Sequence, residues 1–253
     1  MSTTYTFKRI EKKFLMTREQ YDKLLPILKE HLKEDAYGET TVCSIYYDTP
    51  DLYLLRRSVE RPFFKEKLRL RSYGVPSKDS AVFVEIKRKL DGVGYKRRIS
   101  LPYSEAIALL RGKDVPSENP QIKKELLTFI NRYRPVPALF LSYDRLALYD
   151  PTNPDFRVTI DRHMRYRTEH PEIPDVQNTH PLLGDDDRVL MEIKSSSAIP
   201  LWLAVSMSQL GIYQAPFSKA GTCYTQHMAG QRPGSAASAL NTQFSFVTDA
   251  GTT

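Results

Sequence analysis

The chain has 253 residues, of which 41% are hydrophobic and 26% are charged. This composition is ordinary for a globular protein and excludes a chain that is disordered throughout. Lys and Arg number 37 against 30 Asp and Glu, so the net charge of +7 favours a polyanionic partner without choosing among nucleic acid, an anionic membrane and phosphorylated small molecules.

Targeting signals and cysteine motifs are not apparent in the sequence. No apolar run approaches the roughly 18 residues that a membrane-spanning helix needs, and the polar start at residues 1–8 lacks the apolar core of a signal peptide. We therefore expect a cytoplasmic protein without a membrane segment. Cys43 and Cys223 are far apart and belong to no metal-binding motif, so we expect two buried thiols rather than a disulfide or a zinc site.

The first fifth of the chain is predicted to fold as strand, helix and strand. Residues 8–15 form the first strand, and Thr17 is the expected N-cap of a helix that ends near Lys33. Apolar side chains recur along this helix at helical spacing, which predicts that one face packs on a sheet. Residues 40–47 are rich in β-branched and aromatic side chains and form the next strand, which ends at the turn of Asp48, Thr49 and Pro50.

The rest of the chain is predicted to be mainly strands, with three further helices. Alternating segments separated by turns predict a three-stranded meander, and later patterns predict two helices, three strands and a helix that starts at Pro200. The meander covers residues 66–73, 81–90 and 95–101; the helices cover 104–111, 121–133 and 200–210; the later strands cover 138–149, 157–165 and 188–195. Residues 170–187 are an expected exposed loop, and residues 229–253 have the composition of a flexible tail.

Charged residues alternate with aliphatic ones inside several predicted strands. In Lys67-Leu-Arg69-Leu-Arg71 the three cations share one face, because successive strand side chains point to opposite sides. Glu-x-Lys units recur in other strands, at Glu85-Ile-Lys87, Glu192-Ile-Lys194 and Glu11-Lys-Lys13. One face of each strand must therefore be apolar and packed, while the other is exposed to solvent or binds a ligand.

Two interpretations of this alternation remain open for any single strand. The first is a solvent-facing surface with cross-strand ion pairs, which antiparallel sheets use commonly. The second is a ligand-binding interior, and the repetition over four strands favours it. We therefore predict an α+β fold, a closed antiparallel β-barrel or tunnel with a charged interior and helices packed on its outside. A polyanion would compensate the closely packed cations of such an interior.

A chain of phosphates suits this set of side chains. Arg offers a planar fork to phosphate oxygens and Lys offers a point charge, so both together suit several successive phosphates. Glu11, Glu85 and Glu192 are candidates to hold Mg²⁺ or Mn²⁺, which bridges phosphate oxygens during transfer.

These motifs resemble the triphosphate tunnel metalloenzymes of the CYTH-like superfamily, and within them the catalytic domain of VTC-type polyphosphate polymerases. The resemblance covers about residues 7–226, so we expect a tunnel domain at 1–228. The motifs that carry it are short and occur in the family's order: Arg9-Ile-Glu11-Lys-Lys13-Phe14, Lys67-Leu-Arg69-Leu-Arg71-Ser-Tyr73-Gly74, Val84-Glu85-Ile-Lys87, Tyr143-Asp-Arg145, Arg157-Val-Thr-Ile-Asp161, Glu192-Ile-Lys194 and Phe217-Ser218-Lys219.

The resemblance implies roles for individual residues. It makes Glu192 the leading candidate for a metal ligand, and it places Tyr143 and Ser218 beside the phosphates as hydrogen-bond donors. The cations to which it gives phosphate-binding, catalytic roles are Lys13, Arg69, Arg71, Lys87, Arg145, Arg157 and Lys219. Lys67 and Lys194 are expected to add to substrate binding from the same faces. Arg56 precedes the cationic strand and either gathers substrate at an entrance or is simply solvated.

The activity that the resemblance implies is metal-dependent synthesis of polyphosphate from ATP, with Mn²⁺ or Mg²⁺ as cofactor and polyphosphate, pyrophosphate or phosphate as acceptor. Arg9 stands where the wider superfamily has a Glu, and this matches the polymerase branch. The first alternative is a hydrolase of tripolyphosphate or nucleoside triphosphates with the same fold. The second is a barrel that binds polyphosphate or nucleic acid without catalysis, although the aliphatic neighbours of the cations disfavour base stacking.

Overall fold

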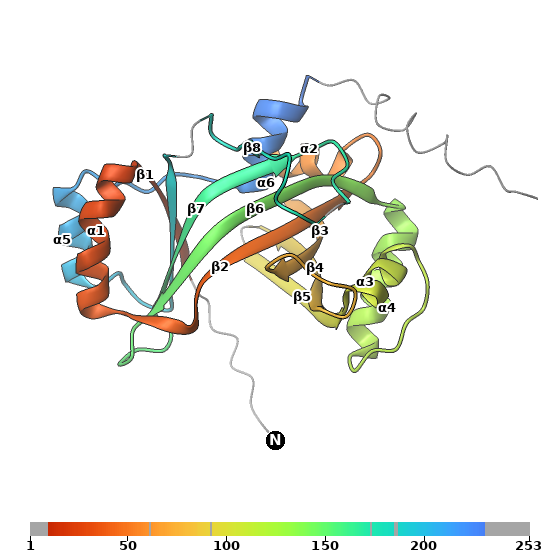
Figure 1. The fold of residues 1–253 in the computed structure, drawn as a ribbon, viewed down its shortest axis with the longest axis horizontal. Helices are drawn as coiled ribbons and strands as arrows, with labels where there is room; N and C mark the ends of the chain where they lie inside the picture. Colours follow the sequence, from red (N-terminus) through yellow and green to blue (C-terminus); the bar gives the residue numbers. More distant parts are fainter. Residues whose placement is uncertain (1–9, 61, 92, 173, 185–186, 231–253) are drawn as a thin grey trace, which may run out of the picture.

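The computed structural model describes residues 10–230 apart from 61, 92, 173, 185 and 186 (Figure 1). Arg9 and residues 231–253 of the predicted tail lie outside the described residues, as do Asp185 and Asp186 of the predicted loop. The described chain combines helices with one nine-stranded sheet, which confirms the α+β class. Among the helices of this part, none is both long and apolar enough to cross a membrane.

The sheet is antiparallel throughout. Its strands are β1 (Ile10–Met16), β2 (Lys33–Asp48), β3 (Phe64–Tyr73), β4 (Ala81–Leu90), β5 (Val93–Pro102), β6 (Val136–Tyr149), β7 (Arg157–Arg167), β8 (His180–Pro181) and β9 (Val189–Ser195). They are hydrogen bonded in the order β1-β9-β7-β6-β2-β3-β4-β5, with the short β8 beside β7. Within the described ranges β1 and β5 are not paired with each other, so the antiparallel sheet is confirmed and its closure into a barrel is not.

Two helices cover the outer face of the sheet at its β1 end. They are α1 (Arg18–His31) and α5 (Leu201–Gln209), which pack on apolar side chains of β1, β7 and β9 such as Phe14 and Ile193 (Figure 1). Thr17 caps α1 as predicted: its side chain accepts a hydrogen bond of 3.2 Å from the Gln20 amide, and the Gln20 side chain accepts one from the Thr17 amide.

The helix boundaries differ from those predicted by one or two residues. The first helix ends at His31 rather than near Lys33, because the chain becomes extended at Leu32 and β2 begins at Lys33. Pro200 is the N-cap of α5 and not its first helical residue.

Two other helices cover the outer face at the β5 end. They are α3 (Tyr103–Leu110) and α4 (Pro120–Tyr133), both at the predicted places. Their apolar sides bury Leu68, Val84 and Ile86 of β3 and β4. Because these residues alternate with charged ones, packing of the apolar side on α3 and α4 turns the charged side chains to the inner face of the sheet.

Three short helices lie over one end of the inner face, and the sequence patterns did not predict them. They are α2 (Tyr53–Val59), α6 (Lys219–Cys223) and the π-helix η1 (Tyr224–Met228). Their side chains form a third apolar cluster with β2, β6 and β7. The segment before α6 also joins the two halves of the curled sheet: the Ala215 amide donates to the Lys13 carbonyl of β1 at 2.9 Å, while Ser218 contacts Lys67 of β3 at 3.4 Å.

Candidate functional site

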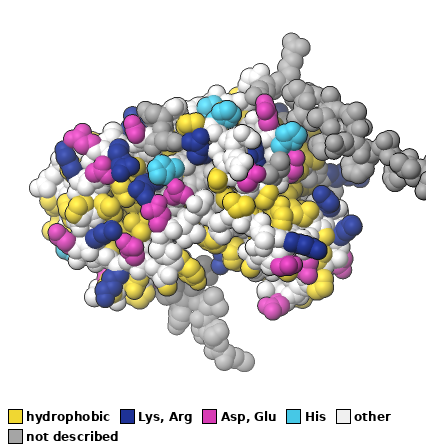
Figure 2. All heavy atoms as spheres, viewed as in Figure 1, with side chains coloured by type: hydrophobic (Ala, Val, Ile, Leu, Met, Phe, Trp, Pro, Cys, Tyr) yellow, Lys and Arg dark blue, Asp and Glu magenta, His cyan; other side chains and the backbone are white. Residues whose placement is uncertain are grey.

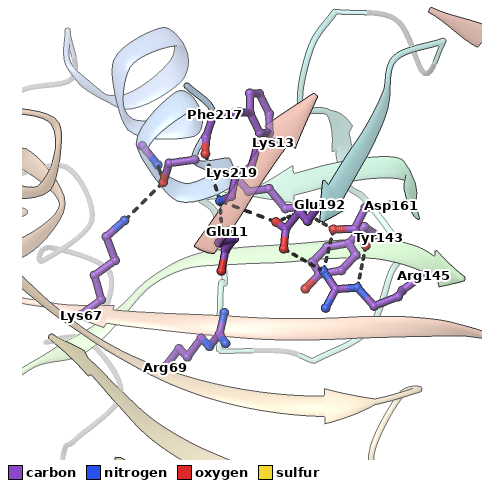
Figure 3. A network of polar contacts seen from close by, with 12 residues as sticks. Glu11, Lys13, Lys67, Arg69, Tyr143, Arg145, Asp161, Glu192, Phe217 and Lys219 are labelled. Atoms are coloured by element: carbon purple, nitrogen blue, oxygen red, sulfur yellow. Dashed lines mark hydrogen bonds and ion pairs between the residues drawn. The ribbon is translucent and has the colours of Figure 1, made fainter. Parts of the chain in front are cut away.

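Polar side chains from eight strands, charged in all but β2, share the inner face of the sheet. Residues directly opposite each other on paired strands lie on the same face. The pairs that define this face include Glu11 with Lys194, Lys13 with Glu192, Arg145 with Asp161, Tyr46 with Arg69, Arg69 with Glu85, Lys67 with Lys87, and Lys87 with Lys96. The curl of the sheet brings its two ends towards each other: Glu11 of β1 interacts electrostatically with Lys87 of β4, and Figure 3 shows β1 and β3 on either side of this cluster of polar contacts.

Asp161 of β7 holds two cations at the centre of the inner face. Its carboxylate accepts hydrogen bonds of 2.6 and 2.7 Å from the Arg145 guanidinium and also pairs with the Lys219 ammonium (Figure 3). Burial raises the pKa of this carboxyl group, but Lys219 and Arg145 outweigh burial and lower it. Asp161 is therefore ionised, and it fixes the position of Arg145 and Lys219.

Glu192 lies at the meeting point of three cations. Its oxygens are 3.6 Å from the Lys13 ammonium, 3.9 Å from the Lys219 ammonium and 4.0 Å from the Arg145 guanidinium. Although burial raises the pKa of Glu192, Lys219, Lys13 and Arg145 lower it far more. The Lys13 ammonium also contacts Glu11 at 3.3 Å and donates to the Phe217 carbonyl at 3.1 Å, so it links two acidic side chains to the segment before α6.

Glu85 of β4 compensates cations on the other side of the inner face. Its side chain is fully buried and pairs with Arg69 at 2.5 Å and with Lys96 at 2.7 Å. Burial raises its pKa, but Arg69, Arg71 and Lys96 lower it to about 2. Both carboxylate oxygens are thus already engaged with protein cations.

Three cations near Glu85 have no carboxylate partner among the described residues: Arg71, Lys67 and Lys87. Arg71 is buried; it donates to the Tyr143 hydroxyl at 3.0 Å, while its Nε has no hydrogen-bond partner in the described part of the chain. Burial lowers the pKa of Lys67 to about 8, and burial together with Arg69 and Arg71 lowers the pKa of Lys87 to about 7. A buried polar atom without a partner, such as Nε of Arg71, is costly, and on the same face Lys67 is half-buried and Lys87 is exposed. This part of the inner face is therefore suited to an anionic ligand.

The face of the molecule shown in Figure 2 differs from the inner face of the sheet in how its charges are distributed. Lys and Arg are interspersed there with Asp, Glu and apolar side chains, and no continuous basic patch is seen. Arg71, Lys67 and Lys87, which have no carboxylate partner among the described residues, instead lie together on the inner face of the sheet.

A family model describes this chain over most of its length. The model of the VTC domain matches residues 8–228, which span the described sheet, its helices and the inner face. The chain belongs to the VTC domain family. Among curated proteins, the search found no match.

Solved structures similar to this VTC domain are distant. The PH1819 protein from Pyrococcus horikoshii OT3 has 11% identity and a TM-score of 0.40, with 81% of this chain and 92% of that chain covered. A chain of the Schizosaccharomyces pombe Mediator head module has 11% identity and a TM-score of 0.39, covering 80% and 90%. A Mimivirus capping enzyme triphosphatase has 8% identity and a TM-score of 0.32, covering 79% and 88%. At these scores we draw no argument from the three similarities.

The VTC domain brings most of the predicted site residues together. Those that contact or directly face one another across the inner face are Glu11, Lys13, Lys67, Arg69, Arg71, Glu85, Lys87, Tyr143, Arg145, Glu192, Ser218 and Lys219. Lys194 lies opposite Glu11 on β1 and opposite Arg157 on β7, and Arg157 is exposed. Arg56 is not part of the cluster: it contacts Asp51 at 3.1 Å and lies over the Tyr53 ring.

Two members of the site were not predicted from the sequence. Asp161 closes a predicted motif but received no role, and Tyr46 of β2, which lies opposite Arg69, was interpreted only as a strand residue. The strand alternation would have placed Tyr46 on a definite face. The pairing of Asp161 with Arg145, in contrast, depends on a register that is shifted by a bulge between Ser142 and Asp144.

The acidic side chains of the VTC domain determine whether it can hold a divalent metal. The described residues contain no group of three or more His, Cys, Asp or Glu side chains arranged around one metal. Glu192 and Glu11 both approach Lys13, whereas the oxygens of Glu85 are engaged by Arg69 and Lys96. Mg²⁺ is commonly held by one or two carboxylates together with substrate phosphates. The donor set therefore fits a metal that arrives with a phosphate substrate, and Glu192 and Glu11 are the side chains that would hold it.

Proposed function

We propose that this VTC domain is a metal-dependent phosphotransferase that extends polyphosphate with the terminal phosphoryl group of ATP. One observation carries the proposal: Arg71, Lys67 and Lys87 face the interior without carboxylate partners in the described part of the chain, beside the cations that Glu85, Asp161 and Glu192 hold in place. Membership of the VTC domain family is consistent with this assignment. We further propose that the sheet closes as a tunnel around its substrate and that residues 1–228 form one domain.

The proposed reaction needs no covalent nucleophile from the protein. In-line phosphoryl transfer depends mainly on positioning and on stabilisation of charge. Arg145 and Lys219, held by Asp161, would grip the transferred phosphoryl group, and Arg71 with Tyr143 would hold the adjacent phosphate oxygens. Bound by Glu192 and Glu11, Mg²⁺ or Mn²⁺ would neutralise charge on the phosphate oxygens. The remaining predicted residues, Arg69, Lys194, Arg157 and Ser218, would guide the chain along the inner face.

Product analysis tests the proposal. The protein is incubated with ATP and Mn²⁺, or with ATP and Mg²⁺, and the products are separated by gel electrophoresis. We expect polyphosphate from the wild type and little or none from Lys87→Ala. The matched control is Lys124→Ala, since Lys124 is an exposed cation on α4, outside the inner face, and this variant should behave as the wild type does.

The two alternatives have their own signatures in the same assay. Release of orthophosphate from ATP and tripolyphosphate without longer chains would identify a hydrolase. Binding of tripolyphosphate without metal-dependent turnover would identify a binding domain. Equal products from the wild type and Lys87→Ala would show that the inner face is not the site of reaction.

A further inference from the structure

Tyr46 brings a phenol group into the cationic part of the inner face. Its hydroxyl oxygen is 3.3 Å from Nη1 of Arg69, which lies directly opposite it on β3. Lys67 and Arg71 flank Arg69 on the same face of β3, Lys87 of β4 lies opposite Lys67, and the carboxylate of Glu85 lies opposite Arg69. The charge of Lys13 on β1 also interacts with Tyr46. On its other side β6 contributes the apolar Leu139 opposite Tyr46, and the nearby Tyr143 hydroxyl accepts a hydrogen bond from Arg71.

This environment favours a negative charge on Tyr46 in the ligand-free protein. Burial alone would raise the pKa of the phenol, but Arg69, Lys67, Lys87 and Arg71 lower it to about 7, compared with about 10 for an ordinary tyrosine. The influence is mutual, because Tyr46 favours the charged form of Lys67 and of Lys87 against burial. A phenolate at this position would act as a counter-charge for Lys67 and Lys87, which lack a carboxylate partner among the described residues.

We propose that Tyr46 exchanges a proton when a phosphate chain binds to the inner face. Phosphate oxygens then neutralise the surrounding cations in place of the phenolate. The phenolate oxygen takes one proton from solvent, and the neutral hydroxyl donates a hydrogen bond to a phosphate oxygen. No covalent bond changes in this step. The inference rests on the proposed function, since it requires that the inner face binds phosphate chains.

Ultraviolet absorbance of tyrosinate tests the ligand-free state. In a titration between about pH 5 and about pH 8, ordinary tyrosines stay almost entirely neutral, whereas the wild type should form nearly one tyrosinate per chain with a midpoint of about 7. Tyr46→Phe keeps the ring and should remove this signal. Tyr47→Phe is the matched control, because Tyr47 lies on the opposite face and its burial raises its pKa. A wild type without tyrosinate in this range, or with a signal that Tyr46→Phe retains, would overturn the proposal.

Addition of tripolyphosphate at about pH 8 tests the proton exchange, with binding measured by calorimetry on the same sample. We expect the tyrosinate absorbance to fall as the wild type becomes saturated and to stay unchanged in Tyr46→Phe. Calorimetry without binding would overturn the proposed function, and the proton exchange with it. Binding with a full tyrosinate signal would overturn the proton exchange alone.

Discussion

Replacement of Asp161 by Asn should destabilise the ligand-free protein strongly. Asp161 is fully buried and holds both Arg145 and Lys219. The amide of Asn keeps the shape of the side chain but leaves two nearly buried cations without their counter-charge, close to Glu192 only. Breaking a buried ion pair by removal of one partner costs about 3–5 kcal/mol. We expect a loss within this range for Asp161→Asn.

Urea unfolding of the wild type and of two variants measures this loss. The matched control is Asp144→Asn on β6, whose carboxylate faces outward and accepts hydrogen bonds from Thr41 at 2.7 Å and from His163 at 2.8 Å. Loss of such contacts should cost about 1 kcal/mol. Tripolyphosphate should restore part of the stability of Asp161→Asn, because a ligand that binds only the folded state stabilises it. Equal destabilisation by the two substitutions would refute the central place that we give to Asp161.

Three further predictions concern single groups of the inner face. Glu85 has a pKa of about 2, below the value of about 4.3 expected in the unfolded chain, so its stabilising effect is complete above about pH 4.3 and is lost as the pH falls towards 2. Urea unfolding at several pH values should show that the difference in free energy of unfolding between wild type and Glu85→Gln shrinks across this window. A constant difference would contradict the assignment. Bound phosphate favours the charged form of Lys87, whose pKa is about 7 in the ligand-free protein, so the affinity for tripolyphosphate should fall as the pH rises above 7. Calorimetry should show that the affinity of Lys87→Arg depends less on pH. An identical pH dependence of the affinity in both proteins would exclude Lys87 from the site. Arg71→Lys should weaken tripolyphosphate binding about tenfold or more, since the planar guanidinium fork is lost. Arg56→Lys should leave the affinity unchanged, because Arg56 pairs with Asp51 outside the cluster. Equal effects of the two substitutions on the affinity would show that Arg71 does not bind phosphate.

The alternation of charged and apolar residues predicted the strands of this fold well. In β3 and β4 the apolar residues pack under α3 and α4, as the two-residue period requires, so each cation could be assigned to a face before its partner strand was known. The start of α1 was predictable because its signal is also local: the Thr17 cap and its partner Gln20 lie within four residues of sequence.

Elements that depend on distant contacts were missed. The helix α2 has Leu52 as its N-cap, without a side-chain cap; its first amides, of Leu54 and Leu55, are instead bound by the carboxylate of Asp48, which sequence reasoning assigned only to a turn. Likewise α6 and η1 have little helical periodicity and are stabilised by the burial of Cys223 and Met228 against β2, β6 and β7. The residues before Thr40 looked too polar for a strand, yet β2 begins at Lys33 and continues through an irregularity between Glu34 and Glu39.

In the candidate site, too, features set by local sequence were predictable and features set by distant contacts were not. The cations of Lys67-Leu-Arg69-Leu-Arg71 were assigned to one face by alternation alone. Which cations are compensated was not predictable, because the partner carboxylates Glu85 and Asp161 come from other strands whose register is set by the packed core. The absence of a carboxylate partner for Arg71 within the described residues, on which the proposed function depends, is therefore visible only in the folded chain.

A crystal structure of the protein with tripolyphosphate and Mn²⁺ would test the central claim most directly. Our account predicts a phosphate chain on the inner face, with its oxygens hydrogen bonded to Arg71, Lys67 and Lys87, and a metal between the phosphates and Glu192. A phosphate chain bound only on the outer surface, with Arg71 still hydrogen bonded to Tyr143 and otherwise unchanged, would contradict it.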